Sequence, residues 1–222
     1  MVTGKNIDFA SLIEAHGAEE LPHMKGIGRR ERKAAATRLK LFRCALQLFA
    51  DRGFQNVTVE DITEAADVGK GTFFNYFKGK DHVLSVLAEI QLGKVRQALD
   101  AAEAGKRSIR LVLQDFFNKV CEEPGRSPDL ARALLTAFLS STIRDQLAQN
   151  IVEGRRMVGR IIELGQERGE VDPKLKNERI ALHLQQGFFG TMLLWSLQGE
   201  PKLQALVEAT FQHFWRAIAA KG

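Results

Sequence analysis

The clearest hydrophobic pattern in the 222-residue chain begins near Arg29. Apolar side chains then recur every three to four residues, the spacing of a helix with one buried face. They are Leu39, Phe42, Ala45, Leu46 and Phe49. The sequence "DRGF" follows, and its Gly53 stands where glycine commonly ends a helix. The pattern predicts a long first helix from Arg29 to this glycine.

A second, shorter helix is predicted to open at Thr58. The sequence "TVED" offers a hydroxyl N-cap and, three residues later, the carboxylate of Asp61, which together make a capping box. Val57 and Ile62 stand at the two positions of a hydrophobic staple. After a break at "DVG", the sequence "KGTFFNYF" restarts a helix. Two short helices joined by a tight turn behind a longer helix are typical of a helix-turn-helix arrangement.

The rest of the chain shows long helical patterns and no strand pattern. They cover about 80–103, 107–122, 128–146, 148–169, 173–198 and 201–219. Pro128, Pro173 and Pro201 are each expected at the first position of a helix. We therefore expect an all-α protein with an N-terminal extension (1–28), a three-helix helix-turn-helix domain (29–80) and a larger helical domain (81–222). The extension is either an arm or a small docked helix.

Residues 70–77 divide into two faces when they are placed on a helix. Advancing 100° per residue puts Phe73, Phe74 and Phe77 on one stripe, which we expect to be buried. Thr72, Asn75 and Tyr76 fall on the opposite side, with Gly71 beside them. A hydroxyl, an amide and a phenol on an outward face suit a helix that enters the major groove of DNA. The alternative is a surface helix whose outward residues have no function.

The charge is concentrated near these predicted helices. Residues 25–80 carry 12 Lys and Arg against 6 Asp and Glu, whereas the whole chain has a net charge of +5. A basic block of this kind is typical of a segment that meets a polyanion, although a merely solvated basic helix is the alternative. Arg29, Arg30, Arg32 and Lys33 form either an arm along the DNA backbone or a solvated helix start.

Other classes of protein find little support in the sequence. The two cysteines, Cys44 and Cys121, lie far apart, and the five histidines show no metal-ligand spacing. No catalytic or dinucleotide-binding motif occurs, so we expect neither an enzyme nor a cofactor or metal. There is no long apolar run and no leader, so we expect a protein that has no membrane span and that is located in the cytoplasm.

One long stretch, "ALQLFADRGFQNVTVEDITEAADVGKGTFFNYFKGKDHVL", resembles the DNA-binding region of the TetR family of bacterial repressors. The resemblance covers about residues 36–90. It implies double-stranded operator DNA as a partner, with a set of contact residues on and around the second and third helices. These are Thr58, Lys70, Gly71, Thr72, Asn75, Tyr76 and Lys80, of which Lys70 and Asn75 are the candidates for base contact and the others for phosphate or close backbone approach.

The sequence departs from the family pattern at three positions. Asp67 stands where a turn glycine is usual, and we expect it to adopt the left-handed conformation that aspartate tolerates. Gly69 replaces a usual serine and removes a side-chain cap, and Phe74 replaces a common tyrosine and removes a hydroxyl.

The last two helical patterns hold more apolar side chains than one buried stripe needs. The resemblance implies a homodimer through these helices, for which we expect an interface of Phe188, Phe189, Met192, Phe211, Phe214 and Trp215. Gly187 and Gly190 would let a partner helix approach closely.

The resemblance also implies a small-molecule inducer bound in the larger domain. The apolar candidates are Phe116, Phe117, Cys121, Phe138 and Trp195, with Arg144 or His183 as a polar anchor, although each can instead be an ordinary core or surface residue. We therefore expect a sequence-specific repressor released from its operator by a small apolar or amphipathic inducer. The alternatives are a helical interaction module and a transcriptional activator without such an inducer.

Overall fold

A computed structural model of the chain describes residues 29–137 and 144–220. Within these ranges every regular element is helical, apart from a single bridge between Val171 and Ala219. The expected all-α fold is confirmed. The predicted extension 1–28 and the candidate ligand residue Phe138 lie outside the described residues.

The N-terminal helices follow the predicted pattern closely. They are α2 (Arg29–Arg52), the 3-10 turn η1 (Phe54–Asn56), α3 (Val59–Ala65) and α4 (Lys70–Phe74). The capping box is confirmed, because the Asp61 amide donates to the Thr58 hydroxyl at 3.1 Å and the Thr58 amide donates to the Asp61 carboxylate at 2.7 Å. Gly53, with φ of 79°, separates α2 from η1.

The larger part of the chain forms five long helices and one shorter one. They are α5 (Lys80–Glu103), α6 (Ile109–Cys121), α7 (Pro128–Ala137), α8 (Arg144–Glu167), α9 (Asn177–Gln198) and α10 (Leu203–Ile218), with the 3-10 turn η2 (Pro124–Arg126) before α7. Pro128 begins α7 behind the Ser127 cap, as predicted.

The predictions for the other two prolines are wrong. The Asp172 carboxylate accepts a bond from the Lys174 amide at 2.8 Å, which forms a turn, and α9 begins only at Asn177. The helix after Pro201 likewise begins two residues later, at Leu203, with Lys202 as its N-cap, and the Pro201 carbonyl accepts a bond from the Trp195 indole at 2.8 Å.

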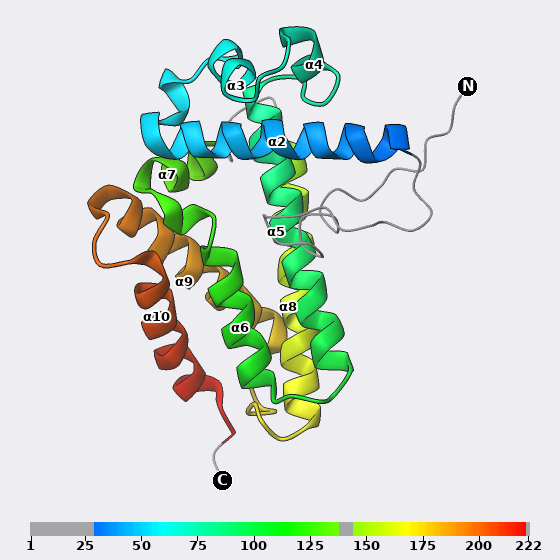
Figure 1. Ribbon diagram of the computed structural model, residues 1–222. Helices are drawn as coiled ribbons and strands as arrows, with labels where there is room; N and C mark the ends of the chain where they lie inside the picture. Colours follow the sequence, from blue (N-terminus) through cyan, green and yellow to red (C-terminus); the bar gives the residue numbers. More distant parts are fainter. Residues whose placement is uncertain (1–28, 138–143, 221–222) are drawn as a thin grey trace.

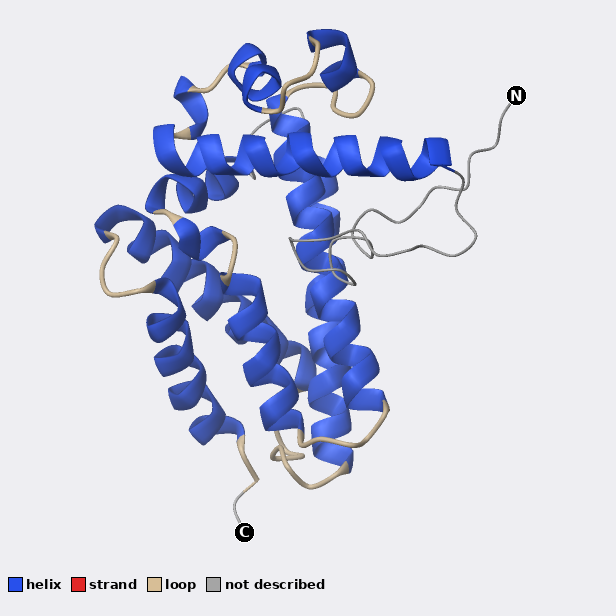
Figure 2. Ribbon diagram, in the orientation of Figure 1, coloured by secondary structure: helices blue, strands red, loops and turns tan. Residues whose placement is uncertain are grey.

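The helices are arranged in two parts (Figures 1 and 2). Helix α2 lies across the upper end of α5, with α3 and α4 above it. Below, α6 and α8 pack along the rest of α5, α9 packs on α8, and α10 packs on α6 and α9. Among the described helices, none combines the length and the hydropathy needed to cross a lipid bilayer.

Two hydrophobic cores follow this division, but their boundary falls inside α5. The upper core contains the side chains of α2, α3 and α4 together with Val83–Ile90 of α5, most of α7 and Leu147 of α8. The lower core begins at Val95 of α5 and includes α6, α9 and α10. The domain boundary at residue 80 stays a prediction; the apolar packing of the upper part extends well beyond that residue.

Candidate nucleic-acid interface and apolar cavity

Helix α4 is held to the upper core by two of the three phenylalanines that were expected to be buried. Phe73 and Phe77 are 0% and 1% exposed, and their ring centroids lie 5.4 Å apart. The turn before the helix contains Asp67 at φ of 49°, as expected from its tolerance of the left-handed region. Gly69 is the N-cap and provides no side-chain bond, again as expected.

The predicted burial of Phe74 is wrong. Its side chain is 51% exposed, and its ring meets the Phe73 ring edge to face at 5.5 Å between ring centroids. Helix α4 ends at Phe74 after little more than one turn, so its contact face is narrow. Phe73 on the helix and Phe77 just beyond its end fill that face, and Phe74, which points about 100° from Phe73, remains in solvent.

The predicted outward residues differ in their exposure. Gly71 and Asn75 are exposed, and a Cβ atom added to Gly71 would meet nothing within 4 Å. Thr72 and Tyr76 are half-buried, and Tyr76 packs against the upper core. Asn75 and Gly71 are therefore exposed, as is Lys70, whereas Thr72 and Tyr76 are less accessible.

Lys70 and Lys80 both have protein partners. The Lys70 ammonium donates to the Glu60 carboxylate, and this hydrogen bond holds the pKa of Glu60 below its ordinary value. Lys80 donates to the carbonyl oxygens of Phe54 at 2.8 Å and Val57 at 3.0 Å, and lies 4.5 Å from the centre of the Phe54 ring. Lys80 thus fixes η1 against the start of α5, a structural role that the sequence did not indicate.

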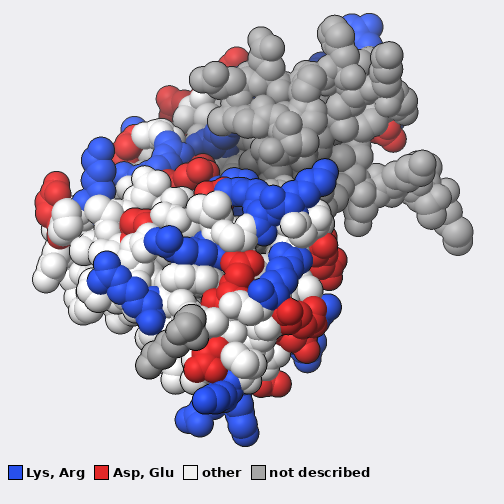
Figure 3. Space-filling view, turned by 90° about the horizontal axis from the view of Figure 1, so that it is seen from below, with Lys and Arg blue, Asp and Glu red and all other residues white. Residues whose placement is uncertain are grey.

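Basic side chains are unevenly placed on the described surface. Arg29, Arg30 and Lys33 are exposed along the first turns of α2. Figure 3 shows the molecule from below, at the end opposite α3 and α4, where Lys and Arg intermingle with Asp and Glu. The described part of the lower end therefore has no uniform basic face to compare with the start of α2.

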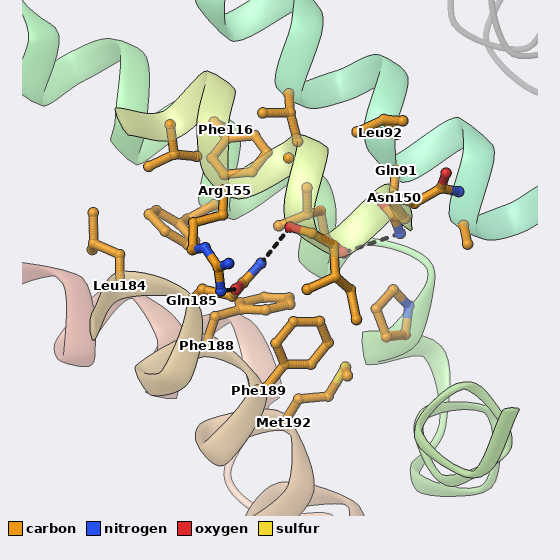
Figure 4. A pocket seen from close by; sticks show the side chains of 18 of the residues that line it. Gln91, Leu92, Phe116, Asn150, Arg155, Leu184, Gln185, Phe188, Phe189 and Met192 are labelled. Carbon is orange, nitrogen blue, oxygen red and sulfur yellow. Dashed lines mark hydrogen bonds between the residues drawn. The ribbon is translucent and has the colours of Figure 1, made fainter. Parts of the chain in front are cut away.

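An apolar cavity with a volume of about 160 Å³ lies among α5, α6, α8 and α9 (Figure 4). Two predicted ligand residues, Phe116 and Phe117, line it. Phe188, Phe189 and Met192 of α9, which were expected at a dimer interface, line it as well. Their apolar excess in the sequence was visible, but the pattern could not tell a cavity from an outer face.

Four polar side chains line this cavity: Gln91, Asn150, Arg155 and Gln185. None was a candidate from the sequence. Each is a polar residue on the inner face of a helix. The sequence alone does not show which face is the inner one, because that depends on the helix packed against it. Arg155 donates to Gln185 at 3.5 Å, and the Gln185 amide donates to the Ile151 carbonyl at 3.0 Å.

The remaining ligand candidates lie elsewhere. Cys121 and Trp195 are buried at 2% and 3% exposure in the lower core without lining the cavity, and burial raises the pKa of the Cys121 thiol to about 12. Arg144 pairs with Asp145 at 3.4 Å. His183 is exposed and borders a much smaller hollow between α9 and α10.

The outer face of α9 carries exposed leucines. Leu193, Leu194 and Leu197 are 50%, 63% and 67% exposed. Of the residues expected at a dimer interface on α10, Phe211 and Trp215 are buried in the lower core and Phe214 is half-buried. A Cβ at Gly187 would lie 3.5 Å from Thr210 of α10, whereas one at Gly190 would meet nothing within 4 Å.

Comparison with known proteins matches both parts of this chain. Residues 41–87 match the family described as bacterial regulatory proteins, tetR family. The HTH-type transcriptional regulator TcmR of Streptomyces glaucescens is 30% identical over 154 residues, which cover 66% of this chain and 66% of TcmR. The HTH-type transcriptional repressor DhaR of Mycobacterium sp. (strain GP1) is 25% identical over 160 residues, or 68% of this chain and 78% of DhaR. These relatives are named as regulators of transcription and not as enzymes.

Solved structures share the same fold. Thermus thermophilus FadR, a TetR-family transcriptional repressor in complex with lauroyl-CoA, gives a TM-score of 0.58 at 25% identity over 83% of this chain and 96% of FadR. SmeT, the repressor of the Stenotrophomonas maltophilia multidrug efflux pump SmeDEF, gives a TM-score of 0.65 at 19% identity over 85% of this chain and 93% of SmeT. Because the family match falls on α2 to α5 and the likeness to TcmR and FadR extends through the helices beyond, the chain belongs to the TetR family of bacterial transcriptional regulators.

Proposed function

We propose that this chain is a homodimeric repressor that binds double-stranded operator DNA through α3 and α4 and is released by a small ligand in the apolar cavity. The observation that carries the proposal is the division of α4. Phe73 and Phe77 anchor the helix, while Gly71 and Asn75 stand exposed beside each other on its outer side.

Each exposed group of α4 has a role that its chemistry suits. Asn75 can pair with the edge of an adenine, and Gly71 lets the backbone come close to the DNA. Phe74 offers an apolar face to a thymine methyl group, a contact that needs no hydroxyl. Thr72 and Tyr76 supply hydroxyls for phosphates, and Thr58 stands at the start of α3. Lys70 reaches the DNA only after it leaves Glu60.

A second copy of the chain supplies the other half of the operator contact. Two recognition helices reach successive major grooves only when they lie about 34–36 Å apart, which a dimer can arrange. Gly190, Leu193, Leu194 and Leu197 repeat at the spacing of one helical stripe on α9. This exposed apolar stripe supports a dimer through α9, with the bacterial cytoplasm as the site of action.

Ligand release follows from side chains that the cavity and the upper core share. Leu134 of α7 and Leu147 of α8 line the cavity and also belong to the core that holds α2, α3 and α4. Helix α5 runs from beside α4 to the cavity without a break. A ligand that displaces these leucines favours a different position of the upper part, which is a population shift between two states. FadR with lauroyl-CoA and SmeT with triclosan, at the same fold, support a ligand in this domain.

The proposal is tested by fluorescence anisotropy with the DNA that lies upstream of the chain's own gene. Binding should survive an excess of unrelated DNA and weaken steeply as salt rises, because phosphate contacts release counterions. Asn75→Ala should lower affinity for this DNA by about 1–3 kcal/mol while leaving the much weaker binding to unrelated DNA unchanged.

A control for a change far from α4 is Lys106→Ala, in the exposed loop between α5 and α6. It removes a positive charge far from α4 and should leave operator affinity unchanged. Binding that ignores DNA sequence, or no binding at all, would instead favour a helical interaction module. Reporter expression in cells that lack the gene separates a repressor, whose loss raises transcription, from an activator.

A further inference from the structure

Two buried polar atoms, on side chains that line the apolar cavity, have no hydrogen-bond partner among the described residues. They are the Oε1 atom of Gln91 on α5 and the Nδ2 atom of Asn150 on α8. Both side chains line the cavity. A buried polar atom without a partner is costly, so a group that supplies the missing bonds would be held strongly here.

The bonds that these two amides already make define what each still needs. The Gln91 amide nitrogen donates to the Val120 carbonyl at 3.3 Å. Since a carbonyl can only accept, the other atom of this amide must be the oxygen, which needs a donor. The Asn150 oxygen accepts from Gln146 at 3.1 Å, which leaves the Asn150 nitrogen as a donor in need of an acceptor.

The packing of α5 and α8 brings these two groups to the same end of the cavity. A Cβ at Gly154 of α8 would lie 3.7 Å from Leu92 and 3.8 Å from Val95 of α5. The two helices run in the same direction, since Leu147 packs in the upper core with the first half of α5. Asn150 stands one turn before Gly154 on α8, and Gln91 stands one turn before Val95 on α5; Figure 4 shows the two residues near each other.

The opposite end of the cavity has different hydrogen-bonding groups. Gln185 uses both atoms of its amide, one toward Ile151 and the other toward Arg155. Arg155 is half-buried, and no carboxylate of the described residues forms an ion pair with it. This end would favour an anion, whereas the Gln91 and Asn150 end needs one group that both donates and accepts.

We propose that the ligand of this cavity is a neutral, hydroxyl-bearing molecule with a compact apolar body, an alcohol or a phenol. Its O–H donates to Gln91 Oε1 and its oxygen accepts from Asn150 Nδ2. The volume of about 160 Å³ suits a body of roughly one ring, since a cavity of about 150 Å³ lined by apolar side chains binds benzene. The identity of the ligand rests on the proposed function, but the hydroxyl site itself does not.

The experiment compares three probes with the same ring: p-cresol, p-xylene and p-toluate. Calorimetric titration of the full chain should give p-cresol an affinity at least about tenfold above that of p-xylene, since two hydrogen bonds replace contacts with a methyl group. In the double variant Gln91→Met, Asn150→Leu, p-cresol and p-xylene should bind with affinities equal within about twofold. Met and Leu resemble Gln and Asn in shape but cannot form the two hydrogen bonds to the hydroxyl of p-cresol. Retained binding of p-xylene shows that the variant cavity is intact.

Arg155→Met is the matched control inside the cavity, and it should leave the preference for p-cresol over p-xylene unchanged. Two outcomes would overturn the proposal. One is a preference for p-cresol that persists in the double variant, which is expected when Gln91 and Asn150 simply bond to each other. The other is tighter binding of p-toluate than of p-cresol, with the difference lost in Arg155→Met, which would identify an anionic ligand.

A second readout separates this inference from the proposed function. Operator release by p-cresol is measured on the complex of the chain with its upstream DNA. Binding of p-cresol through Gln91 and Asn150 without release of DNA leaves the hydroxyl site in place and contradicts the inducer mechanism. If the chain binds its operator but binds p-cresol and p-xylene with equal affinity, the DNA-binding function stands and the hydroxyl site is contradicted.

Discussion

The ammonium of Lys70 lies beside the Glu60 carboxylate near the exposed side chains of α4. In the proposed complex, Glu60 competes with DNA for this lysine and also repels the phosphates. We expect Glu60→Gln to raise operator affinity by roughly threefold to tenfold, since it frees one cation and removes one like charge. The measurement is fluorescence anisotropy at several salt concentrations, where the salt dependence should become steeper.

Glu64→Gln is the matched comparison, because Glu64 is exposed on the same helix and its substitution removes the same charge. It should raise affinity less than Glu60→Gln, since it releases no lysine. Equal effects of the two variants would mean that Lys70 makes no contact with DNA.

Thr58 has two assigned roles that substitution can separate. Its hydroxyl caps α3, and Thr58→Ala should lower the free energy of unfolding by about 1 kcal/mol. Thr58→Ser keeps the hydroxyl and should restore both stability and DNA binding. Chemical denaturation measures the first effect and anisotropy the second. A loss of affinity in Thr58→Ala without a loss of stability would assign the hydroxyl to a phosphate alone.

The same cap is expected to depend on pH. Hydrogen bonds from the Thr58 hydroxyl and amide lower the pKa of Asp61 below its ordinary value of 3.8. A lowered pKa in the folded state gives stability that is present above pH 3.8 and is lost as pH falls through the lowered value. The stability difference between the natural chain and Asp61→Asn should therefore be constant near neutral pH and shrink in this acidic range. A difference that does not change with pH would contradict the capping role of the carboxylate.

At the scale of elements, Gly165 lets α8 pack closely against the residues beside it. A Cβ at this position would meet Val171 at 2.8 Å and Ile109 at 3.3 Å. Gly165→Ala should therefore destabilise the chain by about 1–3 kcal/mol through overpacking. Gly190→Ala, where a Cβ meets nothing within 4 Å, is the control for helix propensity and should not destabilise the protomer. Thermal unfolding of both variants measures the contrast, and equal effects would exclude a steric cause.

The elements also explain how far the sequence could lead. Local signals sufficed for the capping box of Thr58, the left-handed Asp67 and the helix that begins at Pro128, because each depends on residues within one turn. The exposure of Phe74 could not be predicted, since it depends on α4 ending after five residues. The hydroxyl site exists only because α5 and α8 pack side by side. The hydrophobic pattern of either helix around Gln91 or Asn150 does not show which helix packs against it.

At the scale of the whole molecule, the cavity and the helices α3 and α4 are parts of one packed structure. Leu147 lines the cavity and belongs to the upper core that also contains the apolar side chains of α2, so filling or emptying the cavity changes the environment of a side chain of that core. Leu147→Ala should lower the free energy of unfolding by about 2–5 kcal/mol and weaken operator binding together. Unfolding curves and anisotropy on the same variant measure this coupling. Lower stability with unchanged operator affinity would show that the cavity wall and the DNA contact are independent.

In the proposed dimer, the exposed stripe on α9 joins the two chains and so lets two recognition helices act together. Leu194 is 63% exposed near the middle of this stripe, and we expect Leu194→Glu to weaken the dimer by about 2–4 kcal/mol, or roughly 30- to 700-fold. Leu111→Glu is the control, because Leu111 is 46% exposed on α6, away from the stripe. Analytical ultracentrifugation should find monomers only for Leu194→Glu, and its operator affinity should fall because a monomer binds one half-site. A Leu194→Glu protein that remains dimeric would place the interface on another face of the molecule.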